Sequence, residues 1–289
     1  MKIKDILARG ITVSCELFPP KKESELSDYH RVVAEMAKVR PSFMSVTYGA
    51  SGGTSDYTVD IANEVQNRNG VPALAHLTCL SSDKQKIASV LEQLKARGIE
   101  NVLALRGDRV EGVTPPTDRY EHASDLVSAV LASGDFCVGG ACYPEGHPES
   151  PSLRADIENL RYKVDAGVSF LTSQMFFDNT IFYRYLLELH RVGIHVPVIA
   201  GIMPVTHAKQ IMRITSLSGT VLPQRFRMIV ERFGDDPAAM QQAGIAYATD
   251  QIIDLLANGV EHIHIYTMNR PQIAARIFEN LSSIIPHER

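Results

Sequence analysis

The sequence has few cysteines and no long apolar segment. Its 289 residues include four cysteines, no two of which form a C-x-x-C pair. No apolar run approaches the roughly 18 residues needed to span a membrane, and Asp5 and Arg9 interrupt the N-terminus before an apolar core of secretory length. We therefore expect a cytoplasmic protein with reduced cysteines, neither exported nor inserted into a membrane.

An excess of basic residues and the glycine-rich nucleotide motifs are also missing. Lysine and arginine number 29 against 33 aspartates and glutamates, so there is no electrostatic footprint for nucleic acid or an anionic membrane. Neither G-x-G-x-x-G nor G-x-x-x-x-G-K-[ST] occurs, which argues against an open doubly wound sheet. A hydrophobic share of 45% is ample for a globular core, and a small-molecule partner is favoured.

Eight short apolar runs, rich in β-branched residues, recur along the chain. They occupy residues 11–18, 43–49, 72–79, 101–107, 136–143, 170–177, 196–204 and 262–268. Each is followed by a longer segment, such as 83–98 or 156–167, that has helical spacing and a glycine near its end. Repeated βα units need right-handed crossovers and a parallel sheet, and eight of them close into a barrel.

The sequence therefore predicts an α/β fold, a (β/α)8 TIM barrel forming a single domain over residues 1–289. Residues 206–259, between the last two strands, are long for one crossover. Within them we expect residues 221–237 to add an extra helix and loop. No sharp change of composition marks a second domain.

The first strand carries a carboxylate in a position suited to chemistry, because barrel enzymes place their active sites at the carboxyl ends of the strands. Alternation puts Thr12, Ser14 and Glu16 on one face and points Glu16 into the barrel mouth. A partly desolvated carboxyl there could keep its proton at neutral pH and act as a general acid. A salt bridge to an inward lysine or arginine is an equally good interpretation.

The fourth strand ends in Arg106, Gly107 and Asp108, where the glycine allows a ligand to approach the backbone closely. The alternative is a self-satisfied pair of Arg106 with Asp108. His76 in the third strand and His147 after the fifth reach the same end of the barrel. A lone histidine is more often structural than catalytic, so their shared location is what makes them candidates.

Three more groups of residues are candidate ligand contacts. Gln174 ends the sixth strand with an amide that suits the donors and acceptors of a heterocycle, or it satisfies loop backbone. His262, His264 and Tyr266 share one face of the last strand. Arg270, just beyond, could bind a carboxylate or phosphate bidentately, or cap the barrel through a salt bridge.

The helix that follows the fifth strand carries Asp156, Asn159 and Lys163 on one side, by their spacing of three and four. Lys163 could neutralise a pyrophosphate, although such a trio is more often a solvated helix face. A metal-dependent lyase or hydrolase using His76, His147 and His264 is a competing hypothesis. No tight metal-ligand spacing supports it, so no metal site is predicted.

Ordered motifs along almost the whole chain resemble one enzyme family. They are CELFPPK, SVTYGA, AHLTC, LALRGD, CYPEGHPE, TSQMFFD, GIMPV and IYTMNR. In their order and number they are similar to the methylenetetrahydrofolate reductases, of the bacterial type that has only the catalytic barrel. The resemblance implies a flavoprotein that binds FAD noncovalently and takes hydride from NADH or NADPH. It would reduce 5,10-methylenetetrahydrofolate to 5-methyltetrahydrofolate through flavin N5 with ping-pong kinetics, a reaction of one-carbon metabolism and methionine biosynthesis.

The same resemblance assigns roles to residues. Glu16 matches the general acid that assists opening of the folate imidazolidine ring, and Asp108 matches an aspartate that holds the pterin and stabilises the cationic iminium. Gln174, Gln210 and Arg270 would contact folate. The residues that match FAD contacts are Thr47, Tyr48, Ala50, His76, Arg106, Gly107, Asp108, His122, Ala123, Tyr143, His147, Asp156, Asn159 and Lys163.

This chain departs from the family pattern in two places. Some relatives carry an aromatic residue one turn after the glutamine at Gln210, where this chain has Ile214, and some carry a tyrosine on the adenine side of the cofactor, where this chain has His122. The chain ends at Arg289 without a counterpart of the domain that binds S-adenosylmethionine in eukaryotic members, so feedback control by that route is not expected. The family also leads us to expect a homo-oligomer.

A second functional hypothesis is a flavin barrel that forms one subunit of a larger electron-transfer complex. The chain has no cysteine cluster for iron–sulfur ligation. Electrons that do not come directly from NADH would therefore need a partner subunit.

Overall fold

The computed structural model describes residues 1–20, 26–48, 55–109, 112, 114–209, 211, 214–215 and 219–285. Within these residues, eight parallel strands close into a barrel in chain order, with β8 paired to β1. The strands are β1 Thr12–Leu17, β2 Met44–Val46, β3 Ala73–Thr78, β4 Asn101–Leu105, β5 Cys137–Cys142, β6 Phe170–Ser173, β7 Val198–Ile202 and β8 His262–Ile265. Each lies inside its predicted run, which confirms the (β/α)8 fold.

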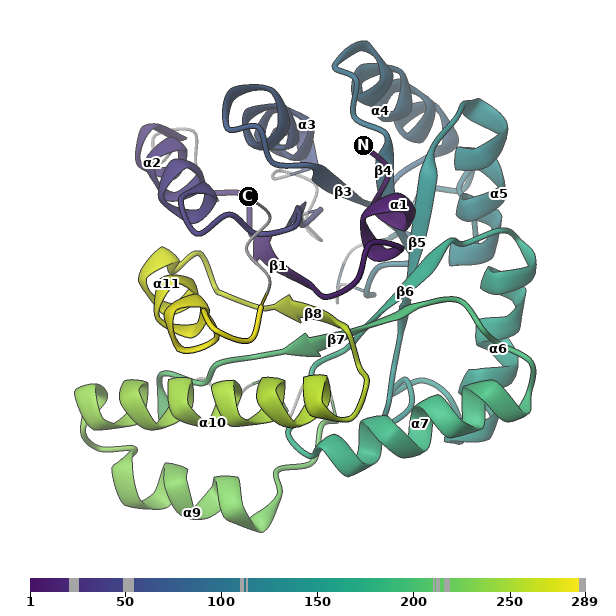
Figure 1. The fold of residues 1–289 in the computed structure, drawn as a ribbon. Coiled ribbons are helices and arrows are strands. Elements are labelled where there is room, and N and C mark those ends of the chain that lie inside the picture. Colours follow the sequence, from purple (N-terminus) through teal and green to yellow (C-terminus); the bar gives the residue numbers. More distant parts are fainter. Residues whose placement is uncertain are drawn as a thin grey trace.

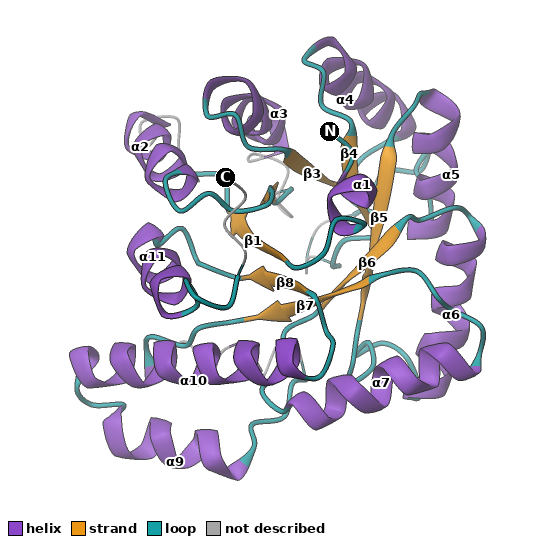
Figure 2. Ribbon diagram, viewed as in Figure 1, coloured by secondary structure: helices purple, strands orange, loops and turns teal. Residues whose placement is uncertain are grey.

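Helices surround this barrel on the outside, except for α1 (Ile3–Leu7), which lies across one end, as Figure 1 and Figure 2 show. In the described part of the chain they are α1 Ile3–Leu7, α2 Leu26–Ala37, α3 Ser55–Asn63, the π-helix η2 Glu64–Arg68, α4 Lys84–Ala96, α5 Ala123–Ser133, α6 Leu153–Asp165, α7 Asn179–Arg191, α9 Gln224–Phe233, α10 Pro237–Ala257 and α11 Pro271–Asn280. Both α9 and α10 lie between β7 and β8, so the extra helix predicted within residues 221–237 is confirmed.

Local sequence signals fix the ends of several helices. The side chains of Asp83, Ser152 and Asp178 accept hydrogen bonds from backbone N–H groups in the first turns of α4, α6 and α7. Each bond satisfies a donor that the helix itself leaves unpaired. After α4, Gly98 adopts a φ of +68°, a conformation that costs glycine little and ends the helix. The helical segments predicted at residues 83–98 and 156–167 correspond to α4 and α6 and are confirmed.

Successive side chains of each strand alternate between the layer packed against the helices and the inside of the barrel. On β1, Val13, Cys15 and Leu17 belong to the large apolar cluster between the barrel and its helices. The intervening Ser14 and Glu16 point into the barrel, where Ser14 contacts β8 and Glu16 reaches the mouth. The predicted inward orientation of Glu16 is therefore confirmed.

Apolar side chains close the amino-terminal end of the barrel. Ile3, Ile6 and Leu7 of α1 insert there, and Figure 1 shows α1 lying across this end. They pack with Phe43, Leu74, Leu103, Cys137, Phe170 and Ile199. Because this end is filled, the interior is a packed core rather than a pore, and a ligand must enter from the carboxyl end.

The insertion between β7 and β8 builds a separate apolar cluster near the carboxyl ends of β6 and β7. Phe226 of α9 stacks on Phe177 with 5.1 Å between the ring centroids, and Tyr247 of α10 donates a hydrogen bond to the Phe177 carbonyl at 2.6 Å. Ile214, the residue that departs from the family pattern, packs against this cluster. Its side chain is therefore partly used in holding the insertion to the barrel.

The cysteines behave as small apolar residues, as the sequence suggested. All four are free and buried. Among the described residues, no helix combines the length and the apolar character that crossing a bilayer would need.

Candidate functional site

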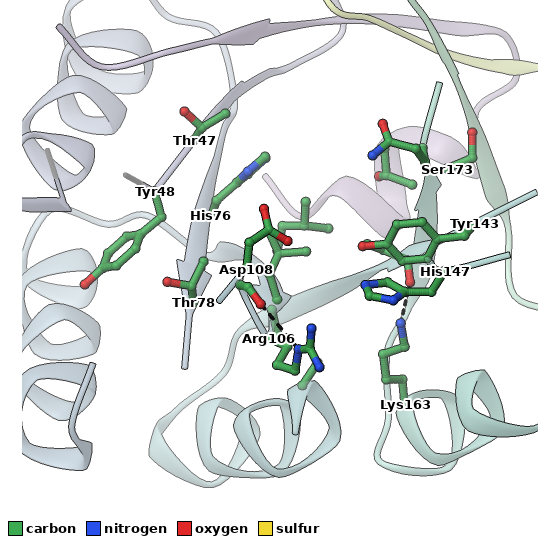
Figure 3. Close-up of a pocket in the computed structure, with 18 of the residues that line it drawn as sticks. Thr47, Tyr48, His76, Thr78, Arg106, Asp108, Tyr143, His147, Lys163 and Ser173 are labelled. Atoms are coloured by element: carbon green, nitrogen blue, oxygen red, sulfur yellow. Dashed lines mark hydrogen bonds between the residues drawn. The ribbon is translucent and has the colours of Figure 1, made fainter. Parts of the chain in front are cut away.

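The carboxyl ends of the strands surround a cavity of about 920 Å³, a volume within the range of small-molecule and cofactor sites. Its walls come from the strand ends and from the first turns and inner faces of α5 and α6. Figure 3 shows Thr47, Tyr48, His76 and Thr78 along one side, with Tyr143, His147, Lys163 and Ser173 along the other. Arg106 and Asp108 lie between these two sides.

This one cavity gathers most of the residues predicted from the sequence. Those that line it are Glu16, Thr47, Tyr48, His76, Arg106, Gly107, Asp108, His122, Ala123, Tyr143, His147, Asp156, Asn159, Lys163 and Gln174. Ala50 and Gln210 lie outside the described residues. Arg270 is described but is not part of the cavity wall.

Glu16 lies deep in the cavity and is 6% exposed. Its Oε2 atom is 3.9 Å from Nε2 of His76, too far for a hydrogen bond. Burial raises the pKa of Glu16 to about 8 and lowers the pKa of His76 to about 3, because each group loses the water that stabilises its charged form. At neutral pH a protonated carboxyl therefore faces a neutral imidazole. No lysine or arginine pairs with Glu16 within the described part of the chain.

Arg106 takes its ion-pair partner from the loop after β5. Its two terminal nitrogens each donate to a different carboxylate oxygen of Glu149 at 2.7 Å, which is the bidentate geometry that guanidinium groups favour. This pair holds the pKa of Glu149 below its usual value. The alternative in which Arg106 is satisfied by Asp108 is therefore wrong for the guanidinium, and the Asp108 side chain remains on the cavity wall.

Gly107 lets the chain turn tightly after β4. Its φ is +86°, and a Cβ atom there would lie 3.1 Å from Cβ of Thr78. Glycine is suited to both constraints, since it tolerates positive φ and leaves room for the neighbouring strand. The close neighbour observed at this turn is Thr78 of β3, and the approach of a ligand to Gly107 stays a prediction.

The far wall of the cavity combines an aromatic pair with a buried amine. Tyr143 and His147 meet edge to face with 4.7 Å between ring centroids, and His147 Nδ1 accepts a hydrogen bond from the backbone N–H of Glu149. Lys163 donates to the Ala141 carbonyl, and burial lowers its pKa. Its ammonium group has no carboxylate within ion-pair distance among the described residues, so it can still meet a ligand anion.

The trio on α6 faces the cavity as one unit. Asp156, Asn159 and Lys163 all line it, and Asp156 accepts a hydrogen bond from the Ser150 hydroxyl at 3.1 Å. A purely solvated helix face would point away from the barrel. The trio instead lines the cavity, and binding of a pyrophosphate by Lys163 stays a prediction.

His264 lines the cavity and belongs to a hydrogen-bond network with two serines. Ser14 donates to the Ile263 carbonyl, so His264 Nδ1 donates to the Ser14 oxygen at 2.7 Å, and His264 Nε2 accepts from Ser45 at 3.1 Å. Both ring nitrogens are occupied, and burial lowers the pKa of His264 to about 3. The described residues contain no cluster of three or more His, Cys, Asp or Glu placed to hold a metal ion.

Three side chains hold Arg270 at the edge of the barrel, and none of them is a carboxylate. Arg270 donates to the Thr206 hydroxyl, to Gln241 Oε1 at 2.8 Å and to a ring nitrogen of His207. The alternative of a barrel-capping salt bridge is not seen in the described part of the structure. Gln174, inside the cavity, accepts from the Met175 N–H through its amide oxygen, which leaves its amide N–H groups available to a ligand.

Two buried atoms in the cavity wall have no hydrogen-bond partner in the described structure, Nε2 of His76 and Oγ1 of Thr172. Sequence reasoning did not single out Thr172, Thr78 or Glu149. Both threonines lie two residues from a predicted site residue on the same strand face, so extending the alternation from His76 and Gln174 would have found them. Glu149 stands at the end of the CYPEGHPE motif, but no local pattern indicates that it pairs with Arg106.

Comparison with known proteins now places this geometry in a family. A family model described as methylenetetrahydrofolate reductase matches residues 2–282. The chain belongs to the methylenetetrahydrofolate reductase family. The resemblance inferred from the motifs is thereby confirmed.

Members of the methylenetetrahydrofolate reductase family from plants and bacteria are similar over nearly all of this chain. Methylenetetrahydrofolate reductase (NADH) 1 of Arabidopsis thaliana is 34% identical over 298 residues, covering 98% of this chain and 50% of that protein. The 5,10-methylenetetrahydrofolate reductase of Escherichia coli K12 is 33% identical over 271 residues, covering 94% of this chain and 90% of that protein. The chain thus spans about half the length of the plant relatives.

Among solved structures, a protein from Clostridium thermocellum described as binding two copies of 5-methyl-5,6,7,8-tetrahydrofolic acid has the same overall fold. The TM-score is 0.72 at 12% identity, over 99% of this chain and all of that one. At this identity the likeness supports the barrel assignment alone.

Proposed function

We propose that this protein reduces 5,10-methylenetetrahydrofolate to 5-methyltetrahydrofolate with FAD as cofactor and NADH or NADPH as electron donor. The observation that carries the proposal is the buried, protonated carboxyl of Glu16 at the inner end of a cavity of about 920 Å³, in a chain of this family. A proton donor at that place is what opening of the folate imidazolidine ring requires.

The cavity fits a flavin dinucleotide in several respects. The unpartnered His76 Nε2 and Thr172 Oγ1 need a hydrogen-bonding ligand, because buried polar groups rarely stay unpaired. Gly107 keeps the wall open. Lys163, whose ammonium has no carboxylate partner among the described residues, would supply positive charge for a phosphate. The residues that would hold FAD are the cavity-lining members of the predicted set, from Thr47 to Lys163. When bound, FAD would carry a hydride from the nicotinamide nucleotide to the folate.

Two acidic side chains of this protein would act on the folate in different ways. Glu16 holds a proton at its carboxyl and would deliver it to the folate nitrogen that leaves when the ring opens. Ring opening places positive charge on the folate, and the carboxylate of Asp108 would stabilise that charge. The two side chains differ in location, since Glu16 is buried and Asp108 is exposed at the rim.

Substrate recognition would fall to the amide of Gln174, whose N–H groups are available in the cavity, and to Arg270, which lies outside the cavity wall at the edge of the barrel. Because no carboxylate pairs with Arg270 among the described residues, its guanidinium is available to a folate carboxylate. The family resemblance assigns a folate contact to Gln210 as well, a residue that lies outside the described part of the chain. Both substrates would use one cavity in turn, which implies ping-pong kinetics. Cytoplasmic location, a homo-oligomeric state and a role in methionine biosynthesis stay predictions.

The absorption spectrum of the purified protein tests this proposal. We expect a flavin spectrum that bleaches anaerobically with NADH or NADPH and recovers on addition of 5,10-methylenetetrahydrofolate. A colourless protein that cannot be reconstituted with FAD would contradict the proposal. Bound flavin that neither nucleotide reduces, but that a copurifying protein does reduce, would favour the electron-transfer subunit instead.

A further inference from the structure

Thr172 on β6 has a hydroxyl group for which the fold provides no partner. The residue is 7% exposed, and its Oγ1 atom makes no hydrogen bond in the described structure. It points into the barrel and lines the cavity together with Gln174, two residues further along. A hydroxyl that is cut off from water and left unpaired costs free energy. The Thr172 hydroxyl therefore destabilises the folded protein unless a ligand forms a hydrogen bond with it.

Other buried threonines show that the fold normally supplies a partner. Thr249 has the same exposed fraction of 7%, and its hydroxyl donates to the Ile245 carbonyl at 2.8 Å. The hydroxyl of Thr267 donates to the Glu16 carbonyl at 2.9 Å. Thr172 differs from both in lining the cavity. The second open atom of the wall, His76 Nε2, lines the same cavity from β3.

We propose that Thr172 Oγ1 is a hydrogen-bond contact to the ring system of the bound flavin. This inference rests on the proposed function. Thr172 pairs in register with Ala141 of β5, and the carbonyl of Ala141 accepts a hydrogen bond from Lys163. Thr172 therefore stands beside the wall of β5 and α6 that we assign to the cofactor. Figure 3 shows its neighbour Ser173 on the side of Tyr143, across the cavity from His76.

The flavin ring system is the fitting partner for chemical reasons. Its edge carries both donors and acceptors, and a threonine hydroxyl can serve either. A polar atom this deep is covered best by a ligand that stays bound, whereas a substrate that leaves each cycle would expose the unpaired hydroxyl repeatedly. Of the two proposed folate contacts, Arg270 follows β8 and is tied to Gln241 of α10, away from the β5 wall. Gln174 lies two residues from Thr172 in the same cavity, so the folate titration below is needed to distinguish the two ligands.

The variant Thr172→Val keeps the shape of the side chain and distinguishes a ligand contact from a structural role. A ligand contact predicts weaker flavin binding without a loss of stability, whereas a structural role predicts a loss of stability. Without flavin, the variant removes an unpaired polar group, so its melting temperature should equal or exceed that of the wild type. With flavin, it loses one hydrogen bond. We expect the dissociation constants for FAD and for FMN to rise by the same factor, about 3- to 10-fold, because both contain the ring system.

The experiment titrates flavin-depleted protein with FAD, with FMN and with 5-methyltetrahydrofolate, and measures the melting temperature of each flavin-free variant. Thr249→Val is the matched control, with a lower melting temperature and unchanged FAD affinity expected, since its hydroxyl is paired far from the cavity. If Thr172→Val does not fold, Thr172→Ser and Thr172→Ala replace it. They differ by one hydroxyl, and the serine variant should bind FAD more tightly.

The possible results separate this inference from the function on which it rests. Wild-type protein that binds FAD, with an unchanged affinity in Thr172→Val, overturns the contact and leaves the proposed function standing. A loss for FAD without a loss for FMN would place the contact at the adenosine end, against our proposal. A loss confined to 5-methyltetrahydrofolate would also overturn it. If the wild-type protein binds no flavin at all, both the Thr172 contact and the proposed function are wrong.

Discussion

The carboxyl of Glu16 and the imidazole of His76 face each other across 3.9 Å in the barrel mouth, and burial keeps both groups neutral at pH 7. An ion pair would need Glu16 to lose its proton and His76 to gain one in a site with little water. Desolvation opposes both changes. The pair therefore stores a proton on the carboxyl, close to where a substrate would bind.

Replacing Glu16 with glutamine should separate the two half-reactions. The amide keeps the size of the side chain and removes the proton donor, so reduction of folate should slow by roughly 100- to 10,000-fold. Reduction of the flavin by NADH should survive because that step needs no proton from Glu16. Anaerobic stopped-flow absorbance measures each half-reaction separately. Loss of both together would show that the change damages the site itself.

The rate of folate reduction should depend on pH through Glu16. Its pKa is raised to about 8, so the acid is protonated below that value and active there. As the pH rises through 8, the rate of this half-reaction should fall, tending to tenfold per pH unit. The nucleotide half-reaction should lack this dependence. A folate half-reaction that loses its rate near the ordinary carboxyl pKa of 4.5 would contradict the assignment.

The stability of the flavin-free protein should also depend on pH through the ionisation of Glu16. The pKa of Glu16 is higher in the folded than in the unfolded chain, so its contribution is fully present below about 4.5 and is lost as the pH rises toward 8. Melting temperatures between these limits should therefore decline less steeply in Glu16→Gln than in the wild type. Parallel curves for the two proteins would mean that the pKa is not raised.

Arg106 and Glu149 offer a test of cofactor recognition. Lysine at position 106 cannot reproduce the two parallel bonds to Glu149, and we expect FAD affinity to fall about tenfold, or roughly 1.4 kcal/mol. Arg154→Lys is a control, since Arg154 pairs with Glu158 on an exposed part of α6. It should leave the affinity unchanged. Isothermal titration of the flavin-depleted proteins compares them, and equal affinities would refute the role of Arg106.

The turn after β4 can be tested against a glycine of similar conformation. Gly107 and Gly98 have φ values of +86° and +68°, but only Gly107 has a neighbour that an added Cβ would crowd. We expect Gly98→Ala to cost about 1 kcal/mol and Gly107→Ala roughly 2–3 kcal/mol in the free energy of unfolding. Urea denaturation measures both. Equal costs would mean that contact with Thr78 is unimportant.

Much of the cavity could be predicted because each strand places its residues by alternation. Given the strand from 11 to 18, Glu16 must face inward with Ser14, and the same rule carries His76 and Gln174 to the barrel mouth. The partners of these residues could not be predicted in the same way. Arg106 meets Glu149 from 43 positions away, and Arg270 meets Thr206 from 64 positions away, which no local pattern encodes.

The sequence by itself determined the eight βα units, the extra helix before β8 and the face on which each candidate residue lies. These depend on periodicity, helix caps and glycines, which act over a few residues. Only the tertiary structure decided the charge of Glu16, the partner of Arg106 and the unpaired state of Thr172. Those properties depend on which side chains the eight strands bring together and on how far the barrel excludes water from them. Both conditions exist only once the barrel has closed.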